Sequence, residues 1–140
     1  MKLVIDASVA LKWVLGDAAD ERDLGRARAL LVHIVSDAHQ LVQPPHWLLE
    51  IVAVMSRRHP DLIGETIETM RAIDFETAND DAIYLRASEL ASRLKQHAFD
   101  TMYHAVALEH GATLITADER YFADGRIEGQ IELLQNFELD

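Results

Sequence analysis

KLVIDASVALKWVL, at positions 2–15, contains a complete strand-turn-helix pattern, and the rest of the chain repeats it. Its first four residues, KLVI, form a short apolar run of the kind that makes a buried strand. Asp6 ends this run, and the apolar residues of VALKWVL at 9–15 recur at helical spacing. We therefore predict a strand, a turn that carries Asp6 and Ser8, and a helix.

Further apolar runs alternate along the chain with longer segments of helical periodicity. The expected strands are KLVI at 2–5, LVQ at 41–43, a brief run around Phe75, TLIT at 113–116 and IELL at 131–134. The expected helices after the first cover 20–38, 46–59, 61–70, 79–95 and 100–111. Such alternation indicates a parallel sheet covered on both faces. We predict a single domain, 1–140, with an α/β three-layer sandwich fold and a central parallel sheet of four to five strands flanked by helices.

Composition limits the class of protein. The longest apolar run, Ile51 to Met55, is far shorter than the roughly 20 residues that cross a bilayer. The first residues reach a charge before a signal-peptide core could form, so we expect a cytoplasmic protein with no membrane association. The absence of cysteine excludes disulfides and thiolate metal sites. The net charge of −11 argues against a general electrostatic clamp on nucleic acid, although bound metal would offset part of it.

Three aspartates stand where expected helices start: Asp6 before the first helix, Asp100 at the start of 100–111, and Asp118 before a further helix that follows the fourth strand. Each could simply be an N-cap, because aspartate accepts backbone N–H bonds well at that position. Ligands of open parallel sheets, however, gather beyond the carboxyl ends of the strands. Asp6 ends the first expected strand and Asp118 follows the fourth, so a shared site is the alternative interpretation.

Glu50 lies inside HWLLEIVAVM, positions 46–55, and interrupts its apolar run. We expect this helix to be covered all round, and burying an unpaired carboxylate costs several kcal/mol. A salt bridge or an exposed stripe would explain Glu50 without any chemistry. The alternative is a divalent cation shared with the strand-end aspartates, since Mg²⁺ and Mn²⁺ prefer carboxylate oxygens and water.

Other candidate residues are weaker. His104 follows Asp100 by one helical turn, so it either contacts a substrate or packs on the helix surface. Tyr103 is interpreted as a core residue or as one whose hydroxyl bonds to the backbone, and Lys12 either reaches a phosphate or is solvated. The chain contains no Walker A or dinucleotide glycine motif, no HExxH pair and no GxSxG elbow.

Four blocks of the sequence, taken together, are similar to one known family. They are VIDASVALKWVL at 4–15, PPHWLLEIVAVM at 44–55, FDTMYHAVALEHGATLITADERYF at 99–122 and IELL at 131–134. In this order and spacing they resemble the PIN domain, and specifically VapC-like toxins of bacterial and archaeal toxin-antitoxin pairs. The resemblance spans essentially the whole chain.

The resemblance implies an endoribonuclease that depends on Mg²⁺, with Mn²⁺ able to substitute. It implies RNA as substrate, a VapB-like antitoxin as partner and a homodimer. The family's acidic cluster falls on four residues that would bind metal and carry the catalysis: Asp6, Glu50, Asp100 and Asp118. Ser8 and Thr116 match hydroxyl residues that support the cluster, and His104 is a further candidate for substrate contact or support.

Three other classes of protein compete with this interpretation. A phosphorylation-receiver domain needs a lysine near the last strand, but the final lysine is Lys95. A phosphatase with a DxDxT motif would need an aspartate where the chain has Ser8. A PIN domain that only binds its partner is also compatible with the fold, although four intact acids favour an enzyme.

Overall fold

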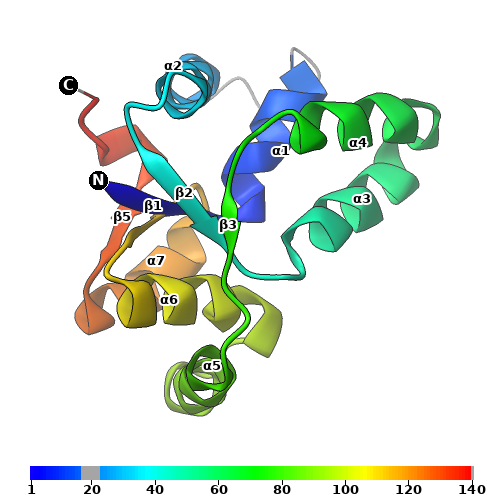
Figure 1. The fold of residues 1–140 in the computed structure, drawn as a ribbon. Coiled ribbons are helices and arrows are strands. Elements are labelled where there is room, and N and C mark those ends of the chain that lie inside the picture. Colours follow the sequence, from blue (N-terminus) through cyan, green and yellow to red (C-terminus); the bar gives the residue numbers. More distant parts are fainter. Residues whose placement is uncertain (17–22, 140) are drawn as a thin grey trace.

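Five short parallel strands form the centre of the molecule (Figure 1). The computed structural model describes residues 1–16 and 23–139. The strand order is β3-β2-β1-β4-β5. The strands are β1 (Lys2–Ile5), β2 (Gln40–Gln43), β3 (Glu76–Thr77), β4 (Thr113–Thr116) and β5 (Ile131–Leu133). The predicted parallel α/β sandwich is confirmed.

Helices cover both faces of this sheet. They are α1 (Ala7–Leu15), α2 (Leu24–Val35), α3 (Trp47–Arg58), α4 (Ile63–Arg71), α5 (Asp81–Leu94), α6 (Ala98–His110) and α7 (Glu119–Gly125). Short 3₁₀ turns are η2 (Pro60–Leu62), η3 (Arg126–Glu128) and η4 (Leu134–Asn136). Figure 1 shows α1 and α2 on one face and α6 with α7 on the other, with α5 packed outside α6. Within the described ranges no helix is long and apolar enough to span a membrane.

The central strand β1 explains why the first segment of the chain is so uniformly apolar. Leu3, Val4 and Ile5 are all fully buried, although successive side chains of a strand point to opposite faces. Leu3 pairs with Leu41 of β2 on one side and with Thr113 of β4 on the other. A strand that is covered on both faces needs apolar residues at every buried position, and Leu3, Val4 and Ile5 supply them, whereas Lys2 at the start of the strand is exposed.

Some element boundaries differ from the prediction. The helix expected from Asp100 begins at Ala98, because α5 ends at a left-handed Lys95 (φ 58°) and the chain then turns within two residues. Asp100 is therefore inside the first turn of α6 and is not its N-cap. Similarly, α4 begins at Ile63 after the turn η2. The predicted start of the second helix, Asp20, lies outside the described residues.

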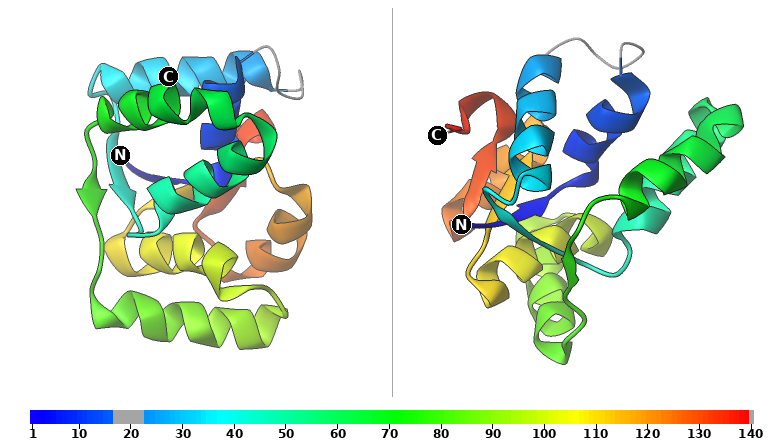
Figure 2. Two further views of the ribbon diagram at one scale, coloured as in Figure 1. Left: turned by 90° about the vertical axis from the view of Figure 1, so that its right-hand side faces the viewer. Right: turned by 45° about the horizontal axis from the view of Figure 1, so that its top comes forward.

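The helices α3 and α4 form a hairpin that leans away from the sheet beside α1 (Figure 2). Only one stripe of α3 therefore faces the core, formed by Trp47, Ile51 and Met55. Leu49, on the opposite side, is 71% exposed. The expectation that this helix is covered all round is wrong, because the hairpin leaves one of its faces open to solvent.

Candidate active site

Asp6 lies where β1 ends, at the centre of the sheet edge. Its backbone N–H donates to the carbonyl of Ile115 on β4 (3.0 Å), which ties it to the neighbouring strand. Its carboxylate caps α1, because Oδ2 accepts the backbone N–H of Ser8 (3.2 Å). The capping interpretation is thus correct for Asp6. It does not exclude a second role, since these bonds involve only one carboxylate oxygen.

Two hydroxyl groups connect Asp6 to the segment that follows β4. Ser8 Oγ donates to Asp6 Oδ2 (2.5 Å), and Thr116 Oγ1 donates to the same oxygen (3.2 Å). Each hydroxyl also accepts a backbone N–H, that of Ala117 for Ser8 and that of Asp118 for Thr116, both at 3.0 Å. The hydroxyls at 8 and 116 therefore join the two strand ends that carry aspartates, as a supporting role requires.

Asp118 is the second strand-end aspartate and the N-cap of α7. Its Oδ1 accepts the backbone N–H of Tyr121 at 3.0 Å. A hollow of about 490 Å³ adjoins it, and Lys12, Asp118 and Glu119 are among the residues that line this hollow. The capping interpretation is correct here too, and Lys12 lies on the same side of the molecule as the acids.

Glu50 and Asp100 reach the same region from two helices. Glu50 lies in the first turn of α3 and Asp100 in the first turn of α6, and both line one hollow of about 410 Å³. The Glu50 side chain is 26% exposed, so it is only partly desolvated. The two acids thus meet at the rim of the cluster, whereas Asp6 lies deeper.

Electrostatics shows that the four acids are neighbours. Burial, with the charges of Glu50 and Asp100, raises the pKa of Asp6 from 3.8 to about 6, against the opposing effect of the Ser8 hydrogen bonds. Burial and the charges of Glu50 and Asp118 also raise the pKa of Asp100. Like charges have this effect only at short range. The structure therefore brings Asp6, Glu50, Asp100 and Asp118 together from four separate segments.

Tyr103 borders the cluster from α6. Its side chain is fully buried, and its hydroxyl, which lies near Glu50, forms no hydrogen bond of regular geometry within the described part of the chain. Burial and the charges of Asp6, Glu50 and Asp100 raise its pKa far above the ordinary value, so the hydroxyl stays protonated. The prediction of a core residue is correct, but the residue is also a buried donor that faces acids.

His104 is fully buried rather than packed on a helix surface. Its Nδ1 lies 2.9 Å from the hydroxyl of Tyr121, and its Nε2 lies 2.8 Å from the carbonyl of Gly129. Burial lowers the pKa of His104, so the ring is neutral, donates to Gly129 and accepts from Tyr121. Protein groups thus occupy both ring nitrogens, which leaves none for a substrate. Support through Tyr121 remains compatible with this position.

Two residues near the acids were missed by the sequence analysis. Gln43 is fully buried at the end of β2, and its side-chain amide both accepts from the Ile5 N–H (2.7 Å) and donates to the Ile5 carbonyl (2.9 Å). It thereby holds the residue before Asp6. The sequence signal for Gln43 was its position as a polar residue at the end of an apolar strand, directly before a Pro-Pro pair. The other missed residue is His46, whose Nε2 lies 3.3 Å from Oε2 of Glu50 and gives this carboxylate a polar neighbour.

The donor set fits a hard divalent cation. All four acids offer only carboxylate oxygens, which suit Mg²⁺ and Mn²⁺. In the described ranges, however, no three acidic or histidine side chains stand in an arrangement that could hold a metal ion as they lie. Asp6 and Asp118 are turned toward their own backbone and hydroxyl donors. A bound cation would draw them inward, so we treat the cluster as a candidate centre.

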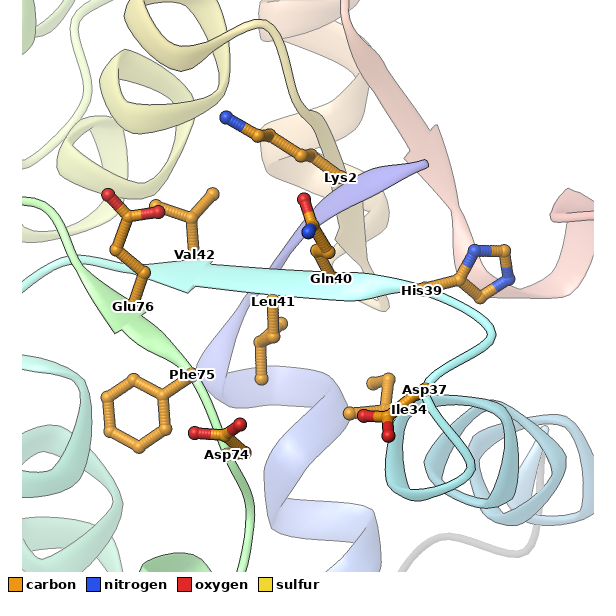
Figure 3. Close-up of a pocket in the computed structure, with 10 residues that line it drawn as sticks. All are labelled: Lys2, Ile34, Asp37, His39, Gln40, Leu41, Val42, Asp74, Phe75 and Glu76. Carbon is orange, nitrogen blue, oxygen red and sulfur yellow. The ribbon is translucent and has the colours of Figure 1, made fainter.

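A further cavity, of about 470 Å³, lies at the other end of the strands (Figure 3). Lys2 and Gln40, the first residues of β1 and β2, line it. Figure 3 shows their side chains on one side of β2 and Leu41 and Phe75 on the other. The cavity therefore does not include any of the four clustered acids.

Comparison with known proteins identifies the family. A model of the PIN domain matches residues 3–126. The chain belongs to the PIN domain family. No curated protein matches the sequence at a significant level. The predicted family is thus confirmed over most of the chain.

Solved structures of the same PIN fold include toxin-antitoxin proteins. VapBC2 from Rickettsia felis, bound to a promoter DNA fragment, has a TM-score of 0.69 at 12% identity, covering 95% of this chain and 98% of that one. VapC20 from Mycobacterium tuberculosis, a toxin that cleaves the sarcin-ricin loop, has a TM-score of 0.66 at 22% identity, covering 88% and 95%. VapBC-1 from nontypeable Haemophilus influenzae has a TM-score of 0.66 at 15% identity, covering 97% and 100%. At these identities the likeness shows the fold.

Proposed function

We propose that this PIN domain is a metal-dependent endoribonuclease and the toxin of a toxin-antitoxin pair. The observation that carries the proposal is the convergence of four acids from β1, α3, α6 and the segment after β4, close enough for Glu50 and Asp100 to raise the pKa of Asp6. Folding of the strands and helices does not by itself require four negative charges at one place. A cluster of this kind destabilises the fold unless a cation compensates it.

The four acids take different roles in the proposal. Asp6, Asp100 and Asp118 hold the cation directly or through water, and Glu50, the more exposed acid, orients or deprotonates the attacking water. Mg²⁺ or Mn²⁺ bound there would polarise the scissile phosphate and stabilise the leaving oxygen. Ser8 and Thr116 keep Asp6 in place, since both donate to its Oδ2 and leave Oδ1 for another partner.

The charge of the protein makes the requirement for metal strict. With a net charge of −11 and four acids at the site, the metal-free protein repels RNA phosphates. The carboxylates do not bind the substrate themselves, because they bind the cation that does. The sarcin-ricin loop cleaved by VapC20 is an RNA target that supports RNA as the substrate class. Such an activity operates in the cytoplasm.

Incubation of the purified protein with total RNA tests the proposal. We expect cleavage with Mg²⁺ or Mn²⁺, none with EDTA, and none for Asp100→Asn at any metal concentration, because that variant lacks one carboxylate of the set. Sequencing of the cut ends would then define the target. Cleavage that persists in EDTA, or at full rate in Asp100→Asn, would contradict the assignment.

We further propose a VapB-like antitoxin and a homodimeric toxin. VapBC2 and VapBC-1 are pairs of this type. An antitoxin arginine or lysine could replace the cation among the acids. Leu49 (71% exposed) and Phe99 (69% exposed) form an apolar surface beside Glu50 and Asp100 that suits a second chain.

Co-expression with the product of an adjacent small reading frame tests this partnership. We expect a stable complex of two toxin chains with antitoxin, measured by light scattering, and inhibition of cleavage that is relieved when the antitoxin is removed. Failure of that product to bind or to inhibit the nuclease would count against the pair.

A further inference from the structure

His46 lies between the two helices that carry Glu50 and Asp100. It occupies the N-cap position of α3, where its backbone carbonyl accepts the N–H of Glu50 at 3.0 Å. Its side chain crosses to α6, where ring Nε2 is 2.9 Å from the backbone carbonyl of Phe99, the residue before Asp100. The same Nε2 lies 3.3 Å from Oε2 of Glu50. One ring nitrogen therefore faces both helices.

The chemistry of these neighbours fixes the proton on the ring. A carbonyl and a carboxylate both accept hydrogen bonds, so Nε2 carries the hydrogen and donates it to Phe99. The polar Nε2–H group also lies beside the Glu50 carboxylate, 3.3 Å from its Oε2. Neighbouring rings hold the imidazole, with centroids 4.9 Å away for Tyr103 and 5.7 Å away for Phe99. His46 is thus fixed on several sides while its side chain stays 16% exposed.

Glu50 needs such a restraint. Its side chain is 26% exposed, and the charge of Asp100 repels it. Its other polar neighbour, the Tyr103 hydroxyl, forms no hydrogen bond of regular geometry within the described residues, so without His46 the carboxylate would turn toward solvent. The open face of α3 leaves room for that movement, since Leu49 beside it is largely exposed. The contact with His46 opposes it, because the ring is anchored on the helix that bears Asp100.

We propose that His46 is a positioning residue that holds Glu50 toward Asp100 so that both can act on one cation. This inference rests on the proposed function of the acids. His46 does not touch the reacting atoms in the proposal and acts only through Glu50. Residues that orient metal-binding groups in this way typically contribute 10-fold to 100-fold to metal affinity or activity.

The experiment uses three variants at position 46 and Mn²⁺ alone as the probe. We expect calorimetry to show roughly 10-fold weaker Mn²⁺ binding for His46→Ala. His46→Gln should restore most of the affinity, because the glutamine amide nitrogen reaches the place of Nε2. His46→Asn should not, because its amide nitrogen corresponds to Nδ1. Rescue by Gln and not by Asn separates positioning of Glu50 from a general loss of packing.

His110→Ala is the matched control. His110 forms a similar pair with a carboxylate, with Nε2 2.8 Å from Oδ1 of Asp80, and it lies at the far end of α6 from Asp100. We expect no change in Mn²⁺ affinity for this variant. Thermal unfolding of each variant in EDTA reports any general destabilisation separately from the metal affinity.

A double-mutant cycle with Glu50→Gln tests whether His46 acts through Glu50. We expect His46→Ala to have no further effect on Mn²⁺ affinity once Glu50→Gln is present. Equal Mn²⁺ affinity of wild type and His46→Ala, or an undiminished His46→Ala effect in the Glu50→Gln background, would overturn the inference. Wild-type protein that binds Mn²⁺ but leaves RNA intact would instead refute the proposed function.

Discussion

Asp6→Asn and Asp118→Asn are each expected to reduce metal-dependent RNA cleavage by about 10³-fold or more, since a metal-held carboxylate contributes several kcal/mol to transition-state stabilisation. Both aspartates end strands of the rigid sheet, and both are fixed by backbone or hydroxyl donors. Asparagine fits the same space and can still accept a cap bond. The loss should therefore reflect the missing negative charge and not a change of fold.

Single-turnover cleavage of one defined RNA at saturating Mn²⁺ measures this effect. Asp61→Asn, on the exposed turn η2, changes the net charge equally and serves as the control with expected wild-type activity. Circular dichroism of each variant verifies the fold. Undiminished metal-dependent cleavage by both purified site variants would refute the assignment of these acids.

Asp6→Asn is also expected to stabilise the metal-free protein at pH 7, by up to about 3 kcal/mol. The pKa of Asp6 rises from 3.8 in its ordinary state to about 6 in the fold, so ionising Asp6 at neutral pH costs folding free energy. Asparagine removes that cost because it carries no charge to bury and none to repel Glu50. The gain is smaller where the lost charge weakens the bond from Ser8.

Proton binding at Asp6 determines how the free energy of unfolding changes with pH. Between about pH 4 and pH 6 the native protein binds more protons at Asp6 than the unfolded chain does, so the free energy of unfolding falls as pH rises through this window. Above about pH 6 Asp6 is ionised in the native protein, and its charge lowers the free energy of unfolding by the full amount. The difference between Asp6→Asn and wild type should therefore be near zero at pH 4 and largest at pH 7.

Urea unfolding in EDTA at several pH values measures this difference. The control Asp61→Asn should show no such pH dependence, because its side chain is exposed and outside the cluster. Added Mn²⁺ should reverse the order at pH 7, stabilising wild type and leaving Asp6→Asn unchanged. A stability difference that does not vary with pH would show that Asp6 is not strained by its charge in the fold.

The sequence by itself determined the layered architecture. KLVI, LVQ and TLIT are short and apolar, and helices of ten or more residues separate most of them, so only a parallel sheet covered on both faces can bury both kinds of segment. It also placed Asp6 and Asp118 at strand ends, because the carboxyl ends of parallel strands lie at the same edge. These features depend on local periodicity, which the sequence displays directly.

Local periodicity did not predict the positions of Glu50 and Asp100 correctly. Periodicity put Glu50 on an enclosed helix, whereas the lean of the α3–α4 hairpin leaves one face of α3 in solvent. The same periodicity predicted Asp100 as a helix N-cap, whereas α6 begins two residues before it. A cation shared by Glu50 and the strand-end aspartates was one interpretation of the residues themselves, and the resemblance to the PIN domain implied the full set of four acids.

Only the tertiary structure decided which side chains hold the acids. Gln43 bonds Ile5 across 38 positions of sequence, and His46 contacts the carbonyl of Phe99 across 53. His104, close in sequence to Asp100, proved to be buried against Tyr121 and Gly129. The spacing of residues within one element can be read from its sequence. Contacts between elements depend on how helices lean and turn on the sheet, which packing of the whole chain determines.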